Sequence, residues 1–208
     1  MEAILTYIME HVTSFDRSIL RALYAVMNSG PMGGFMDTVM PKITILGDNG
    51  YFWIALAVIL LIPKKTRRTG TAMLVAMLLG LIFCNGLIKH LVMRPRPYDT
   101  WGFPLQRDHL LIPALNDYSF PSGHTTSSVA AATAIFKDHS VWGFAAFLLA
   151  LLIAFSRLYL GVHYPSDVFG GLILGFLMGL WGSSITKTVG DRMDARKKRK
   201  LAEAQAEQ

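Results

Sequence analysis

Two long apolar segments near the end of the chain meet at a short polar region, and this feature constrains the fold most strongly. Residues 141–156 and 165–186 have the composition of membrane helices, whereas the region where they meet carries Arg157, His163 and Asp167. Ionisable side chains are costly to place at membrane depth, and those found there commonly mark functional sites. The sequence therefore predicts a helical membrane protein with a polar site at one end of the bundle.

The overall composition agrees with a membrane protein of a single domain. Of the 208 residues, 52% are apolar and only 16% are charged, which is unusual for a soluble domain of this length. The single cysteine, Cys84, cannot form an intramolecular disulfide. The net charge is +6, but the basic residues flank the apolar segments instead of lining a polar face. We therefore do not expect nucleic acid as a partner.

The apolar segments predict an all-α integral membrane bundle of five to six transmembrane helices with an amphipathic helix at the N-terminus. Residues 2–28 place apolar side chains at three- and four-residue steps, which is typical of an amphipathic helix. Asp16 and Arg17 make this segment a poor membrane span, so we expect it to lie along the interface or beside the bundle. Full insertion would make it a sixth span. The five expected spans are residues 43–62, 70–93, 121–136, 141–156 and 165–186.

These segments define one domain followed by a charged tail. Residues 1–186 are expected to form a single membrane domain, with residues 1–30 as its N-terminal helix and residues 43–186 as its transmembrane core. Residues 187–208 are rich in lysine and arginine and are expected to form a basic cytoplasmic tail. In the last span, glycines at four-residue steps predict close packing against another helix: Gly171, Gly175 and Gly179.

The distribution of basic residues predicts which side of the membrane each loop occupies. With five spans, the turn at residues 64–68, the turn at Lys137 and the C-terminal tail fall on one side, and they hold more than half of the 20 lysines and arginines. The positive-inside rule assigns that side to the cytoplasm. The polar clusters then lie together on the extracytoplasmic side. We therefore expect a multi-pass protein of the plasma (inner) membrane with a cytoplasmic C-terminus.

Three polar clusters at the span boundaries could form a binding site for phosphate. Lys89, Arg96 and Arg157 would repel one another on one face unless an anion lay between them. Arginine also matches phosphate oxygens with a planar fork. Ser122 and Gly123 open the third span, where a helix N-terminus directs free N–H groups at an anion. Such a cradle holds phosphate without a metal or other cofactor.

Two histidines and one carboxylate supply the reactive groups. His163 and Asp167 are four residues apart, so the carboxylate could fix the tautomer of the imidazole and leave its other nitrogen free to attack phosphorus. His124 could protonate the leaving group and later accept a proton from water. These residues suggest phosphoryl transfer through a phospho-histidine intermediate. The same three side chains could instead ligate zinc, although the neighbouring cations would disfavour a dication.

The clusters also match a known set of motifs in order and in internal spacing. The three parts are Lys89-x6-Arg96-Pro97, Pro121-Ser122-Gly123-His124 and Ser156-Arg157-x5-His163-x3-Asp167. In these residues the chain resembles the type-2 phosphatidic acid phosphatase superfamily, which includes bacterial lipid phosphatases, glucose-6-phosphatase, acid phosphatases and vanadium haloperoxidases. A match of all three parts is far more specific than any one part alone.

The resemblance implies an all-helical fold with His163 as nucleophile, Asp167 as its partner and His124 as acid. It implies phosphate ligands at the cationic and helix-capping positions: Lys89, Arg96, Ser122, Gly123 and Arg157. Family members of similar size act on lipid phosphates such as undecaprenyl diphosphate, phosphatidylglycerophosphate and phosphatidate. The implied activity is hydrolysis of a membrane lipid phosphate without a metal.

Two other functions fit the same residues. A phosphotransferase would pass the phosphoryl group to a lipid or sugar instead of water. A non-enzymatic transporter or anion-binding protein would use the charges to line a pathway. Arg94 and Arg107 lie outside the motifs and are expected to anchor the protein at the lipid headgroups, although Arg94 could instead contact the substrate.

Overall fold

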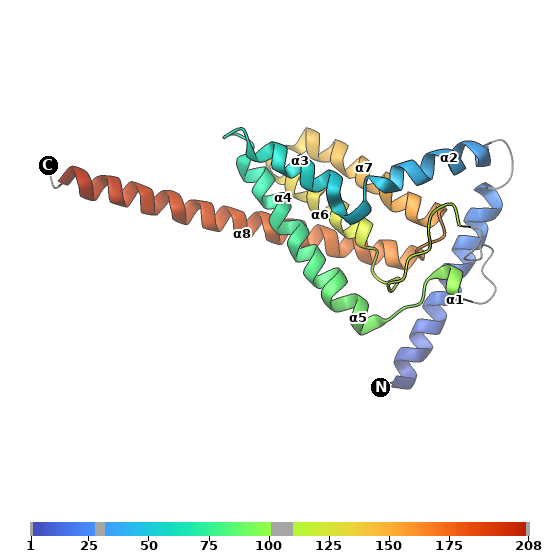
Figure 1. Ribbon diagram of the computed structural model, residues 1–208. Helices are drawn as coiled ribbons and strands as arrows, with labels where there is room; N and C mark the ends of the chain where they lie inside the picture. Colours follow the sequence, from blue (N-terminus) through green and yellow to red (C-terminus); the bar gives the residue numbers. More distant parts are fainter. Residues whose placement is uncertain (1, 28–31, 101–109, 207–208) are drawn as a thin grey trace.

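The computed structural model describes residues 2–27, 32–100 and 110–206, and every regular element in them is helical (Figure 1). In chain order the elements are α1 (Glu2–Met27), α2 (Met32–Ile45), η1 (Asp48–Gly50), α3 (Tyr51–Leu61), α4 (Arg67–Gly80), η2 (Leu81–Ile88), α5 (Lys89–Val92), η3 (Pro97–Asp99), α6 (Gly123–Asp138), α7 (Ser140–Tyr159) and α8 (Pro165–Ala206). The expected all-α class is therefore confirmed for the described residues.

Three helical stretches in the described residues are long and apolar enough to cross a membrane. They are Arg67–Asp99, which joins α4 to α5 through the π-helical η2, and the helices Ser140–Tyr159 and Pro165–Gln205. α2 and α3 make a fourth candidate, a span bent by 41° at η1. The expected first span, residues 43–62, is thus the greater part of a broken pair of helices. The full count of five to six spans stays a prediction.

The remaining expected span, residues 121–136, corresponds to α6, which lies in the centre of the bundle. α6 has 16 residues, is rich in alanine, serine and threonine, and is buried along almost its whole length. It packs against α4, α7 and α8. Because α6 is surrounded by protein on these sides, it can be less apolar than a helix that faces lipid.

Close packing of α6 on α8 brings the polar ends of the two helices together. A Cβ atom on Gly175 would lie 2.6 Å from the carbonyl oxygen of Thr126, so the backbones approach at a distance that only glycine allows. The predicted packing role of the glycines in α8 is therefore confirmed. At the start of both helices, the backbone N–H of Ser122 donates to the carbonyl oxygen of Asp167 at 3.0 Å. This bond joins two of the three motifs.

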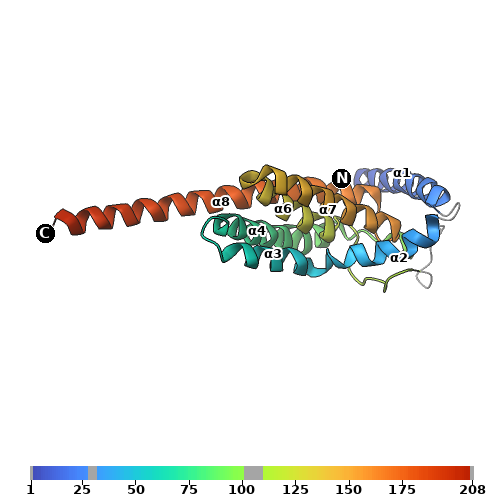
Figure 2. The same cartoon turned by 90° about the horizontal axis from the view of Figure 1, so that it is seen from above.

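α8 continues well beyond the bundle. It has 42 residues, and in Figures 1 and 2 its C-terminal half extends away from the other helices. Residues 187–205 are exposed and continue the same helix without a break. The basic segment expected from residue 187 is therefore the outer part of a membrane helix, and its cytoplasmic location stays a prediction.

α1 packs beside the end of the bundle that carries the motifs. Leu20 and Tyr24 are buried there, and the hydroxyl of Tyr24 donates to the carbonyl oxygen of Tyr159 in the last turn of α7 at 2.9 Å. Phe15 remains exposed. The described part of α1 therefore lies beside the bundle, whereas its amphipathic, interfacial character stays a prediction. Residues 28–31 lie outside the described residues.

Candidate active site

The polar clusters predicted from the sequence meet at one end of the bundle. Lys89 begins α5, Arg157 lies in the last turn of α7, and His163 lies in the connection from α7 to α8. Six of the predicted residues line one cavity of about 730 Å³: Lys89, Arg96, Gly123, His124, Arg157 and His163. The other two, Ser122 and Asp167, are buried beside them. All eight candidates are thus brought together.

His163 is buried between a carboxylate and several cations. Its Nδ1 lies 3.4 Å from Oδ2 of Asp167, an ion-pair distance without hydrogen-bond geometry, and its Nε2 lies 3.5 Å from Nη1 of Arg96. Burial lowers the pKa of His163 well below its usual range, and the positive charges of Arg96, Arg157 and Lys89 lower this pKa further. The imidazole is therefore neutral near neutral pH, as a nitrogen nucleophile must be.

Asp167 accepts hydrogen bonds on both carboxylate oxygens. Oδ2 accepts from the backbone N–H of Tyr164 at 2.8 Å and from the hydroxyl of Ser119. Oδ1 accepts from Nη1 of Arg94 at 2.7 Å. These bonds hold the carboxylate in one orientation beside His163.

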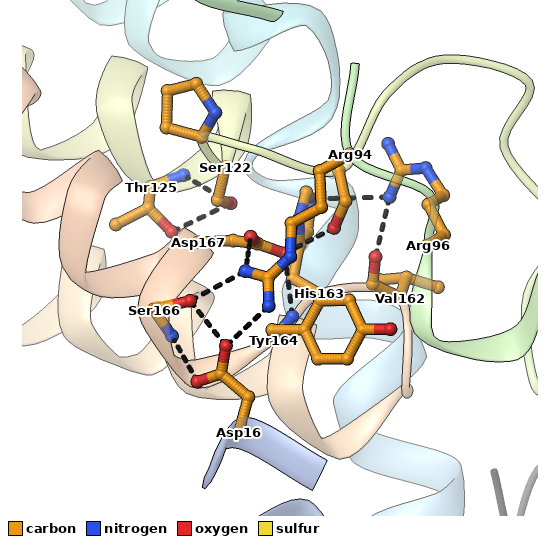
Figure 3. A network of polar contacts seen from close by, with 12 residues as sticks. Asp16, Arg94, Arg96, Ser122, Thr125, Val162, His163, Tyr164, Ser166 and Asp167 are labelled. Carbon is orange, nitrogen blue, oxygen red and sulfur yellow. Dashed lines mark hydrogen bonds and ion pairs between the residues drawn. The ribbon is translucent and has the colours of Figure 1, made fainter. Parts of the chain in front are cut away.

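Arg94 is a member of the site that sequence reasoning misplaced. It was expected to anchor the protein at the headgroups, but its side chain is only 3% exposed and is enclosed by Asp16, Ser166 and Asp167 (Figure 3). Its Nη2 donates to Oδ2 of Asp16 at 2.7 Å, and its guanidinium carbon lies 3.9 Å from the ring centroid of Tyr164. The anchoring role is therefore wrong, because two buried carboxylates draw the side chain into the protein.

Asp16 connects α1 to this network. Its carboxylate accepts from the backbone N–H of Ser166 at 3.0 Å and from the hydroxyl of Ser166 at 2.5 Å (Figure 3). Asp16 and Arg94 are 78 residues apart, and Asp16 belongs to none of the three motifs. The one available signal was a carboxylate in an otherwise largely apolar helical stretch, and it was interpreted only as an obstacle to membrane insertion.

Asp117 pairs with two of the predicted phosphate ligands. Its carboxylate contacts Nζ of Lys89 and accepts from Nη2 of Arg96 at 2.6 Å. Burial alone would raise the pKa of Asp117, but its hydrogen bond to Lys89 and the charges of both cations lower this pKa to about 2. The side chain remains 53% exposed at the cavity. Sequence reasoning missed Asp117, and its position before the second motif gave no signal.

Arg157 is the least satisfied of the three predicted cations. Nη1 donates to the hydroxyl of Thr44 in α2, whereas Nε and Nη2 are buried without a hydrogen-bond partner among the described residues. Leaving charged donors buried and unpaired is costly, so an anion that reaches them gains a strong interaction. Arg157 therefore favours binding of phosphate at this point of the cavity.

The start of α6 places Ser122, Gly123 and His124 next to the cations. Ser122 is the N-cap of α6, and its hydroxyl oxygen accepts from the backbone N–H of Thr125 at 3.4 Å. The helix N-terminus can bind an anion with its free N–H groups. Nε2 of His124 lies 2.7 Å from Oδ1 of Asp48, a residue that sequence reasoning left without a role.

The ligand set considered for zinc is not assembled. Among the residues that the structure describes, no three histidine, cysteine, aspartate or glutamate side chains are grouped so that they could hold one ion. His124 and Asp167 each have their own partners, Asp48 and Arg94. The arrangement is instead that of a cationic cavity with two imidazoles, which suits phosphoryl transfer by charge stabilisation and proton transfer.

Comparison with known proteins agrees with this geometry. Residues 69–191, more than half of the chain, match the family model of the PAP2 superfamily. The chain belongs to the PAP2 superfamily. The matched region of this PAP2 protein contains all three motifs.

The curated relatives include proteins named undecaprenyl-diphosphatase. The protein BcrC of Bacillus subtilis is 33% identical over 144 residues, which cover 69% of this chain and 72% of the relative. The protein of Sulfolobus acidocaldarius is 31% identical over 137 residues. That match covers 65% of this chain and 62% of the archaeal protein, less than two thirds of its length.

A solved structure shares the fold of this PAP2 protein. The phosphatidylglycerolphosphate phosphatase from Bacillus subtilis, a transmembrane PAP2 protein, superposes with a TM-score of 0.66 at 27% identity. The superposition covers 86% of this chain and 88% of that protein. This PAP2 protein is therefore a multi-pass membrane protein with the architecture of a known membrane phosphatase.

Proposed function

We propose that this PAP2 protein is a lipid phosphate phosphatase that hydrolyses a phosphate ester or anhydride of a membrane lipid. The relatives named for undecaprenyl diphosphate and phosphatidylglycerophosphate make these two lipids the leading substrates. The single observation that carries the proposal is the pairing of a buried, neutral His163 with the unsatisfied guanidinium of Arg157 in one cavity. A nucleophile and an anion site in the same cavity are what phosphoryl transfer requires.

The reaction follows from the roles of the two histidines. Nε2 of His163 attacks phosphorus and forms a P–N bond as the bond to the leaving oxygen breaks, while His124 gives that oxygen a proton. Water then attacks the phospho-histidine, His124 takes a proton from the water, and the P–N bond breaks to release phosphate. Lys89, Arg96 and Arg157 offset the charge of the phosphoryl group in both steps, with no metal.

The walls of the cavity support a lipid as the substrate. Its cationic end is followed by apolar side chains from α3, α4 and η2: Ile54, Leu74, Met77, Leu78 and Leu81. Leu78 and Leu81 are also exposed on the outside of the bundle, where lipid would contact them. The phosphate would enter the cavity while the hydrocarbon chain stays in the bilayer and passes between α3 and α4. Short, water-soluble phosphate esters turned over as well as long-chain lipids would contradict this entry path.

The length of α8 supports a site on the extracytoplasmic side of the plasma (inner) membrane. Asp167 lies in the first turn of α8, and the basic segment lies in the other half of this helix, which has 42 residues in all. A helix of this length spans about 60 Å, which is more than the thickness of a bilayer. The basic end would be cytoplasmic by the positive-inside rule. A cysteine introduced in the basic end, labelled only after the inner membrane is opened, would support this orientation.

Phosphate release by the purified protein tests the proposal. The protein in detergent is given undecaprenyl diphosphate or phosphatidylglycerophosphate, with a chelator present, and free phosphate is measured. We expect release that vanadate inhibits and that His163→Ala abolishes. Rapid acid-free quenching should trap phosphate on the wild-type protein as a base-stable, acid-labile adduct. Transfer of the phosphate to a lipid or sugar in place of water would identify a phosphotransferase, and phosphate released equally by His163→Ala would overturn the mechanism.

A further inference from the structure

Asp48 and His124 form a second carboxylate–histidine pair at the cavity. Oδ1 of Asp48 lies 2.7 Å from Nε2 of His124, whereas the contact between His163 and Asp167 is 3.4 Å. Asp48 comes from η1, 76 residues before His124, and it is part of none of the three motifs. The carboxylate–imidazole distance at the proposed acid, His124, is therefore shorter than the one at the proposed nucleophile, His163.

We propose that Asp48 is a positioning residue for His124, and that it determines which nitrogen of that imidazole exchanges protons with the substrate and with water. This inference rests on the proposed function of His124 as acid and base. It also gives a role to the break between α2 and α3, which lies outside the three motifs.

The backbone at this break brings the carboxylate to the imidazole. The two helices are bent by 41°, and Asn49 and Gly50 both have positive φ, +49° and +68°. A Cβ atom on Gly47 would lie 2.6 Å from Cδ2 of His124, so a larger residue could not let the ring approach. Glycine and asparagine adopt a left-handed backbone more readily than other residues, so Asn49 and Gly50 allow the tight turn that follows Asp48. The break therefore holds Asp48 in place against His124.

The contact assigns the two ring nitrogens to different tasks. A carboxylate can only accept, so Asp48 keeps a hydrogen on Nε2. Gly47 lies against the neighbouring Cδ2, which leaves Nδ1 on the opposite edge of the ring. In the first step, the imidazolium gives its Nδ1 proton to the leaving oxygen. In the second step, Nδ1 takes a proton from water as the oxygen of that water bonds to phosphorus and the P–N bond to His163 breaks.

Asp48 also offsets the positive charge of Arg157, which faces His124. Arg157 lies near this ring, and an imidazolium at His124 needs a counter-charge beside it. The side chain of Asp48 is 50% exposed, so its substitution does not leave a hole in the core. An effect of Asp48→Asn on activity can therefore be separated from an effect on folding.

A pair of substrates with different leaving groups tests the inference. One is a long-chain alkyl phosphate, whose alkoxide needs a proton to leave. The other is a nitrophenyl phosphate with an alkyl chain of the same length, whose nitrophenolate leaves without one. For Asp48→Asn we expect kcat/KM to fall about 10- to 100-fold on the alkyl phosphate, a part of the factor of about 10²–10⁴ that a general acid contributes. On the nitrophenyl phosphate, which needs no acid, we expect a fall of less than about threefold.

Three further variants separate the outcomes. His124→Ala should show the same contrast between the substrates, and Asp48→Glu should restore part of the activity lost in Asp48→Asn. Asp37 lies in the same broken span, and its carboxylate is bonded to Tyr159. As the control, Asp37→Asn should keep the wild-type ratio of kcat/KM between the two substrates. Equal losses on both substrates, or no loss, in Asp48→Asn would overturn the inference alone. Equal losses on both substrates in His124→Ala would instead overturn the proposed acid.

Discussion

Arg94 donates to Asp167 at 2.7 Å and so fixes the carboxylate that lies beside the proposed nucleophile. The same guanidinium donates to Asp16 of α1 at 2.7 Å, which makes Arg94 a bridge between the N-terminal helix and the start of α8. Its fork shape matters, because two parallel donors reach two carboxylates that one ammonium group could not hold in the same way. The carboxylate beside His163 is therefore held in part by a helix outside the motif region.

Replacing Arg94 should therefore lower both stability and turnover. Arg94→Gln leaves two buried carboxylates without their counter-charge, which should cost about 3–5 kcal/mol of unfolding free energy. Arg94→Lys keeps the charge but not the fork, and we expect kcat to fall about 10- to 100-fold with a smaller change in KM. Thermal unfolding in detergent and steady-state kinetics measure the two effects. In the double variant Asp16→Asn/Arg94→Gln part of the stability should return, and its failure to return would show that the two residues are not coupled.

Loss of the Arg157 side chain should weaken anion binding. Its two unpaired nitrogens offer charged hydrogen bonds, each worth about 1.5–3 kcal/mol, so Arg157→Ala should raise the inhibition constant for vanadate at least about 10-fold. Arg199→Ala, in the exposed part of α8 where Arg199 pairs with Glu203, is the matched control and should have no effect. Unchanged vanadate inhibition in Arg157→Ala would place the anion elsewhere in the cavity.

Removal of the Asp117 carboxylate should have the opposite effect. Asp117 occupies donors of both Lys89 and Arg96, so a phosphate must compete with it for these two cations. Because Asp117 is half-exposed, the competition is modest, and Asp117→Asn should tighten vanadate inhibition about 2- to 10-fold. Weaker inhibition would instead mean that Asp117 holds the two cations in position for the anion.

The depressed pKa of His163 predicts a component of the pH dependence of stability. In the unfolded chain this imidazole takes up a proton below about pH 6.5, whereas the buried imidazole in the folded protein stays neutral. Protonation therefore favours the unfolded state, and this component lowers the stability as the pH falls from about 7 to 5. His163→Gln should show a smaller loss of apparent unfolding temperature over that range. An identical loss in both proteins would mean that His163 is protonated in the folded state.

Much of the candidate site was predictable because its signals are local in the chain. His163 and Asp167 are four residues apart, and Ser122 and Gly123 occupy the start of one helix. Such short spacings report which side chains share a turn or a helix end, whatever the rest of the fold does. Apolar composition likewise indicated helices, because a membrane span must satisfy its own backbone hydrogen bonds.

The number of spans was harder to predict than their existence. α6 is surrounded by other helices, so it carries alanine, serine and threonine where a lipid-facing helix would carry larger apolar residues. The α2–α3 pair is interrupted at Gly47, where the close approach of the His124 ring leaves no room for a side chain. In both places the local composition depends on a neighbour that is far away in the chain. A hydropathy profile carries no information about such a neighbour.

The helical membrane class, the cationic and imidazole side chains and the kind of chemistry they can perform all follow from the residues in order. The partners of these side chains become known only from the folded chain: Asp48 for His124, Asp117 for Lys89 and Arg96, and Asp16 with Arg94 for Asp167. They differ in this way because a buried charge needs a counter-charge within a few ångströms in space. Any helix that reaches the cavity can supply that charge, whatever its distance along the chain.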